Sequence, residues 1–68
     1  MDKTVASDLM KTLLELSASM NTVAALIEKI DDEKQKLILR GGIADLMGAV
    51  YTDLMRPIIR EYPELNPD

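Results

Sequence analysis

The sequence predicts an all-α fold: an antiparallel helical hairpin, two copies of which form a four-helix bundle. Good helix formers such as Leu, Ala, Met, Lys and Glu dominate the 68-residue chain. Its apolar residues recur at helical spacing on both sides of a short polar break. The first helix also carries no charge from Leu16 to Ile27, although a helix on the surface of a monomer normally has a charged outer face. These three features favour a helical assembly in which other helices surround the first one.

The size of the chain points to self-association. A single domain of about 60 residues buries only about 60% of the surface that its unfolded chain exposes. Small domains therefore usually add disulfides, a metal or a partner subunit. The sequence contains no cysteine and no histidine, which excludes disulfides and metal sites built on thiolate or imidazole. We therefore expect a homodimer, with another protein as a further partner, and no cofactor or metal.

The first helix is expected to begin near one of three candidate N-caps, Asp2, Thr4 or Ser7. Its apolar residues follow a heptad over three repeats, with alternating spacings of four and three. They are Leu9, Leu13, Leu16, Met20, Val23, Ile27 and Ile30. A second row lies beside them: Ala6, Met10, Leu14, Ala24 and Leu26. The apolar stripe is wider than a two-stranded coiled coil needs, which is typical of a bundle core.

The polar break after Ile30 predicts a tight turn. Asp32 and Gln35 have the spacing of a capping box, with Asp32 as N-cap of the next helix. Glu33 places negative charge at the positive end of that helix dipole. Because the connection is so short, the two helices should be antiparallel neighbours.

The second helix is expected to start near Glu33, and Gly41-Gly42 interrupts its pattern. Its apolar residues are Leu37, Leu39, Ile43, Met47, Val50, Leu54 and Ile58. The two glycines are either a helix stop or a place where the backbones approach closely. We favour a continuous or slightly bent helix, with the glycines opposite Met20 and Asn21.

Proline residues shape the end of the chain. Pro57 has no N–H and clashes with the preceding turn, so the helix should kink there or end near Met55, followed by a further turn through Tyr62. Pro63 and Pro67 then stop regular structure. The expected organisation is a hairpin domain over residues 1–62 and an extended tail over residues 63–68.

Two sets of residues are candidates for binding. The expected self-association interface comprises Leu16, Met20, Val23, Ala24, Ile27, Ile43, Met47, Val50 and Leu54. A candidate patch for another partner surrounds Pro57 and comprises Tyr51, Met55, Ile58, Ile59 and Tyr62. Methionine and tyrosine are adaptable residues that are common at interfaces, although a plain core would use the same residues.

No catalytic motif is visible. The serines have no histidine base, and the glycines do not form a phosphate-binding loop. Asp45 and Asp53 are eight residues apart and could share a helix face, but a solvated face with Asp53 near Arg56 explains them better. We therefore do not expect an enzyme.

Charge and hydropathy bear on location and on polyanionic partners. A net charge of −4 argues against nucleic acid and against anionic membranes. The charge-free run of twelve residues is shorter than the roughly 20 residues that span a bilayer. The start of the sequence is amphipathic and does not look like a signal peptide. A cytoplasmic protein without a membrane partner is expected.

The expected architecture resembles the ROP-type helical hairpin, whose two copies make an antiparallel four-helix bundle. RNA binding is not implied for this chain, because the middle of its first helix has no Lys or Arg. We expect a small non-enzymatic interaction protein, an adaptor or regulator. The alternative is a nucleic-acid-binding regulator that uses basic residues near the hairpin ends: Lys3, Lys11, Lys34, Lys36 and Arg40.

Overall fold

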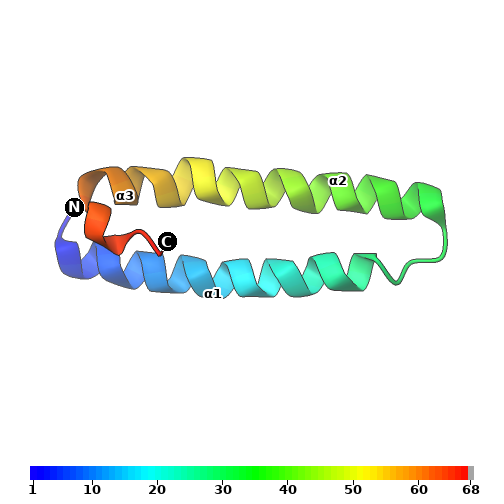
Figure 1. Ribbon diagram of the computed structural model, residues 1–68, viewed down its shortest axis with the longest axis horizontal. Coiled ribbons are helices and arrows are strands. Elements are labelled where there is room, and N and C mark those ends of the chain that lie inside the picture. Colours follow the sequence, from blue (N-terminus) through cyan, green and yellow to red (C-terminus); the bar gives the residue numbers. More distant parts are fainter. Residues whose placement is uncertain (68) are drawn as a thin grey trace.

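Two antiparallel helical rods lie side by side and form a hairpin (Figure 1). The computed structural model describes residues 1–67, and these residues contain helices and no strands. The elements are α1 (Lys3–Ile27), α2 (Glu33–Ala49), the π-helical turn η1 (Val50–Met55), α3 (Arg56–Glu61) and the 3-10 helix η2 (Pro63–Leu65). The rod measures 46 × 18 × 16 Å. The predicted all-α hairpin is confirmed.

Side-chain caps start both long helices. The carboxylate of Asp2 accepts a hydrogen bond from the backbone N–H of Thr4 at 2.8 Å, which selects one of the three candidate N-caps. The carboxylate of Asp32 accepts from the N–H groups of Lys34 and Gln35, at 2.9 and 3.3 Å. The predicted N-cap at Asp32 is therefore confirmed, and it satisfies backbone donors that have no partner within the helix.

Helix α2 runs without a break through Gly41 and Gly42, as we favoured. Neither glycine has a positive φ, so neither needs the left-handed conformation that glycine permits. A Cβ atom added at either position would meet nothing within 4 Å. The expected close approach to Met20 and Asn21 is therefore wrong, because both glycines lie on exposed surface.

A π-helical turn, η1, directly precedes α3, and Pro57 lies in the first turn of α3. The backbone N–H of Arg56 donates to the carbonyl of Tyr51, five residues earlier. The wider turn gives the proline ring room where an α-helical carbonyl would clash with it. It also adds one residue to the register, so Val50 and Met55 both face α1 although they are five positions apart. The rod thus continues beyond Met55, where the sequence suggested that it could end.

The core is a single seam between the two rods. Its buried members are Ala6, Met10, Met20, Ile27, Val50, Met55 and Ile58. On α1 the seam follows Ala6, Met10, Leu13, Ser17, Met20, Ala24 and Ile27. The predicted heptad is therefore rotated, since Leu9, Leu16 and Val23 are exposed and Met10, Ser17 and Ala24 take their place beside α2. The small side chains of Ser17 and Ala24 leave room for larger side chains across the seam.

The C-terminal segment folds back on the hairpin, and both chain ends lie at the same end of the rod (Figure 1). Residues 63–65 form η2, and Leu65 packs with Tyr62 against the core. The tail expected to be extended is therefore partly helical up to residue 65. The burial of the apolar Leu65 side chain explains why the segment is not extended, because this burial stabilises the conformation in which the segment folds back on the hairpin. Residue 68 of the expected tail lies outside the described residues.

Candidate interaction surface

One face of the hairpin is lined by large aliphatic side chains, which we call the leucine face. It comprises Leu9, Leu16 and Val23 from α1 and Leu39, Leu46 and Leu54 from the second rod. These side chains are between 43% and 53% exposed. They stand in line because each row repeats every seven or eight residues, close to two helical turns.

The two rows lie on the same side of the seam. Leu9 and Leu16 directly precede the seam residues Met10 and Ser17, and Leu46 directly precedes Met47. In a right-handed helix, the residue before a seam position always lies on the same side of it. Because the rods are antiparallel and face each other, this side is the same for both. The rows therefore flank the seam on a single face of the molecule.

The middle of the leucine face carries no charge. The α1 positions one step further from the seam on that side are Val5, Thr12, Ser19 and Leu26. On α2 the corresponding positions are Gln35, Gly42 and Ala49. Val5 and Leu26 are themselves half exposed and lengthen the apolar row of α1. Extended apolar surfaces of this kind are uncommon on soluble monomers, which makes the leucine face a candidate interaction surface.

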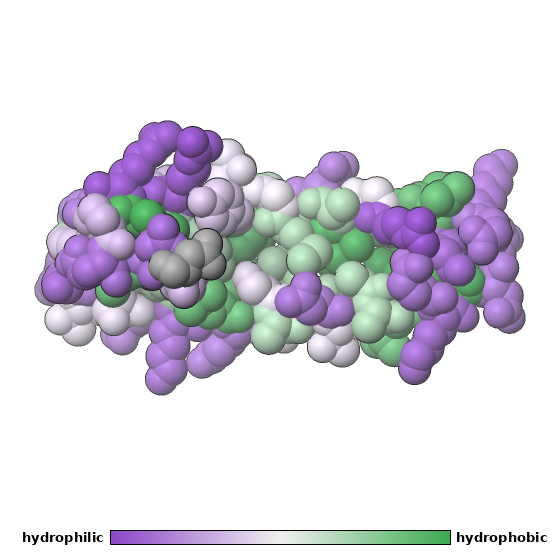
Figure 2. Space-filling view, in the orientation of Figure 1, coloured by the Kyte–Doolittle hydropathy of each residue, from purple (hydrophilic) through white to green (hydrophobic). Residues whose placement is uncertain are grey.

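The opposite face differs in chemistry. It is formed by the residues that directly follow seam positions: Leu14, Asn21 and Glu28 on α1, and Leu37, Ala44 and Tyr51 on the second rod. An ion pair crosses it, in which Arg40 donates to Glu28 at 3.0 and 2.6 Å. On the face that Figure 2 shows, strongly hydrophilic residues gather mostly towards the two ends of the rod, whereas weakly hydrophobic residues fill its middle.

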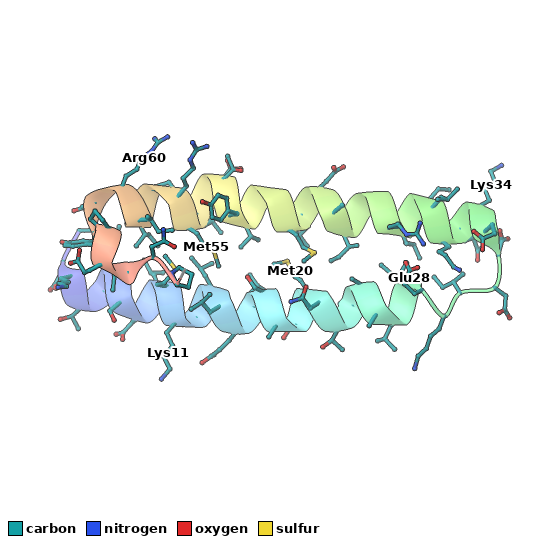
Figure 3. All side chains as sticks on the ribbon, viewed as in Figure 1. Lys11, Met20, Glu28, Lys34, Met55 and Arg60 are labelled. Carbon is teal, nitrogen blue, oxygen red and sulfur yellow. The ribbon has the colours of Figure 1, made fainter. Side chains whose placement is uncertain are left out.

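Polar contacts close the hairpin at both ends. Figure 3 shows Glu28 near the turn, where its bond from Arg40 lowers the pKa of its carboxyl group. At the other end, Glu61 accepts from the N-terminal ammonium group at 3.0 Å, and the hydroxyl of Tyr62 donates to the carbonyl of Met1. Partial desolvation is the main cause that raises the pKa of Tyr62. The leucine face lies between these two sets of polar contacts and contains none of its own.

The residues predicted for self-association divide into two groups. Those in the seam are buried (Met20, Ile27 and Val50) or half-buried (Ala24, Ile43 and Met47) against the chain's own second rod. Those on the leucine face are exposed: Leu16, Val23 and Leu54. Only the second group is available to another molecule.

The patch predicted around Pro57 is not brought together as one exposed surface. Met55 and Ile58 are buried in the seam, and Ile59 and Tyr62 are half-buried beside it. Tyr51 is exposed, but it lies on the opposite face. The π-helical turn causes this division, because its extra residue rotates Met55 inward and Leu54 outward.

Sequence reasoning did not include Leu9, Leu39 and Leu46 in the interaction surface. The signal was present, since Leu39 and Leu46 repeat at the same seven-residue spacing as Leu9, Leu16 and Val23. It was missed because periodicity alone does not tell which of two adjacent rows faces the neighbouring helix within the chain.

The basic residues of the alternative function are mostly paired. Lys3 forms an ion pair with Glu64 at 2.9 Å, and Lys36 forms one with Glu33 at 3.3 Å. Arg40 is paired with Glu28. These pairs place a carboxylate beside each cation, which weakens any attraction for phosphate.

Within residues 1–67, no group of three acidic residues is close enough to hold a metal ion. No helix in the same part of the chain has the length and apolar character needed to cross a membrane. Compared with known proteins, the chain matches no family model, no curated sequence and no solved structure.

Proposed function

We propose that this chain is a small non-enzymatic interaction protein that works as a homodimer, with two hairpins forming a four-helix bundle. The observation that carries the proposal is the uncharged leucine face, which one hairpin leaves in water. Fully burying one leucine side chain stabilises a protein by about 1.5–3 kcal/mol. A second copy of the chain offers the same kind of face and would supply that burial.

The shape of the single chain supports the proposal. A monomeric protein of 7.6 kDa typically exposes about 4,300 Å², whereas this hairpin exposes 4914 Å². Its radius of gyration is 14.6 Å, compared with about 11 Å for a compact chain of this length. Two thin rods bury little surface between them. The addition of two more rods would bury more of the surface that a single hairpin leaves exposed.

Light scattering coupled to size-exclusion chromatography tests the assembly. We expect a mass of twice 7.6 kDa at micromolar concentration, together with high helical content by circular dichroism. Dissociation on dilution should be accompanied by a fall in thermal stability, because the dimer and its stability are linked. A fully helical particle of single-chain mass that melts at the same temperature at every concentration would contradict the proposal.

The adaptor or regulator role needs a separate test. Immobilised wild-type protein should retain a specific host protein, and that protein should elute with a dimer of the chain in solution. A gel-shift experiment at low salt addresses the nucleic-acid alternative. We expect no shift, whereas a shift that weakens steeply with added salt would favour phosphate binding.

A further inference from the structure

We infer that the second copy docks on the leucine face, so that the rows centred on Leu16 and Leu46 form the middle of the four-helix bundle. This inference rests on the proposed homodimer and specifies which of the two broad faces of the hairpin is buried. The occupant is a second copy of this chain because the face has the area, the symmetry and the charge-free chemistry of a self-complementary interface.

The apolar stripe of α1 extends beyond the seam on the side of this face. On one side of the seam stand Leu9, Leu16 and Val23, which are all apolar. On the other side the matching positions are Leu14, Asn21 and Glu28, two of which are polar. A helix that packed only against α2 would need no such bias. The bias therefore indicates a second neighbour on the leucine side.

The size of the rod is compatible with the interface of a stable dimer. The rectangle of 46 × 18 Å that encloses the rod, its two polar ends included, covers about 800 Å², and one partner contributes about 800 Å² of accessible surface to a standard protein interface. Homodimer interfaces are also more apolar than the average protein surface, with few charges at their centre. The leucine face is apolar and free of charge at its centre, around Leu16 and Leu46.

The face is symmetric about the middle of the rod. Leu16 lies one residue from the centre of α1, and Leu46 lies one residue from the centre of the helical stretch 33–61. Apolar residues flank each of them at about two turns in either direction. A twofold axis at this level, across or along the rod, therefore superposes apolar rows on apolar rows. Either axis brings Leu16 of one copy against Leu16 or Leu46 of the other.

Matched glutamate variants provide the first test. Leu16→Glu changes a side chain that is 43% exposed on the leucine face, and Leu14→Glu changes one that is 41% exposed on the opposite face of the same helix. We expect Leu16→Glu to weaken the dimer by at least about 100-fold, because the change occurs in both copies. Leu14→Glu should keep the dimer mass. The reverse result would overturn the inference.

Leu46→Glu and Leu37→Glu form a second matched pair, on the second rod. Leu46 is 53% exposed on the leucine face, and Leu37 is 58% exposed on the opposite face. Dissociation by Leu46→Glu with an intact dimer in Leu37→Glu supports the docking face. Equal dissociation by both variants, or by Leu37→Glu alone, contradicts it.

Cysteine cross-linking gives a readout that does not require a variant to dissociate. The wild-type chain has no cysteine, so Leu16→Cys, Leu46→Cys and the control Leu14→Cys each introduce one reactive site per copy. Under a short thiol-to-thiol cross-linker, Leu16→Cys should couple to itself or, in a mixture, to Leu46→Cys. Coupling only through Leu14→Cys in a particle of dimer mass would overturn the docking face but leave the homodimer intact. A monomer of wild-type chain would instead refute the proposed function.

Discussion

Arg40 of α2 donates two hydrogen bonds to the carboxylate of Glu28, from Nε to Oε2 at 3.0 Å and from Nη2 to Oε1 at 2.6 Å. The pair joins the residue that follows α1 to the first half of α2, across the turn. Bidentate pairing matches the planar guanidinium to the planar carboxylate, so it fixes geometry as well as charge. It holds the turn end of the hairpin, where α2 has no buried residue of its own.

The first prediction concerns the pH dependence of this pair. In the folded protein, the hydrogen bond that Arg40 donates lowers the pKa of the Glu28 carboxyl group below its ordinary value of 4.5. The stability that the pair contributes is therefore present above pH 4.5 and is lost as the pH falls through the lowered pKa. In Arg40→Ala, the Glu28 carboxyl should titrate closer to its ordinary value, measured by NMR. An unchanged titration of Glu28 in this variant would show that Arg40 does not set its pKa.

The second prediction compares two aspartate substitutions in the charge-free part of α1. Met20 is 4% exposed in the seam, whereas Val23 is 44% exposed on the leucine face. Met20→Asp should cost several kcal/mol and abolish the fold, because an unpaired carboxylate would be buried. Val23→Asp should keep its helical circular dichroism at low temperature and reduce the dimer mass. Similar unfolding by both variants would contradict this assignment of the two positions.

The third prediction concerns the helical glycines. A Cβ atom added at Gly41 or Gly48 would meet nothing within 4 Å, and neither position has a positive φ. Gly41→Ala and Gly48→Ala should each raise the free energy of unfolding by about 0.5–1 kcal/mol, through lower chain entropy in the unfolded state. The melting temperature should rise by several degrees. The reverse change, Ala44→Gly, is the control and should lower it.

The fourth prediction tests why η1 is a π-helical turn. If the turn accommodates Pro57, deleting Asp53 should restore α-helical register and drive the proline ring into a backbone carbonyl, at a cost of about 3 kcal/mol. The same deletion combined with Pro57→Ala should cost much less. Urea denaturation of the four chains in this cycle measures the coupling. Additive effects of the two changes would mean that Pro57 does not require the turn.

Much of the local structure could be predicted from the chain. Asp32 followed by Gln35 identified the start of α2, and the short polar break identified the antiparallel turn. These predictions succeed because caps and turns depend on neighbours in the sequence. The row of α1 residues that faces α2 could not be predicted in the same way. Rows such as Leu9–Leu16–Val23 and Met10–Ser17–Ala24 are adjacent on one helix, and only the packing against α2 chose between them.

The sequence alone determined the two long helices, the N-cap of α2, the hairpin turn and the lack of charge in the middle of α1. Each of these follows from interactions over a few residues or from composition. Only the tertiary structure decided that the row Met10–Ser17–Ala24 lies in the seam while Leu9, Leu16 and Val23 stay outside it. The physical reason lies in two effects: the packing of the two rods against each other, and the extra residue in η1 that turns Met55 inward and leaves Leu54 in water.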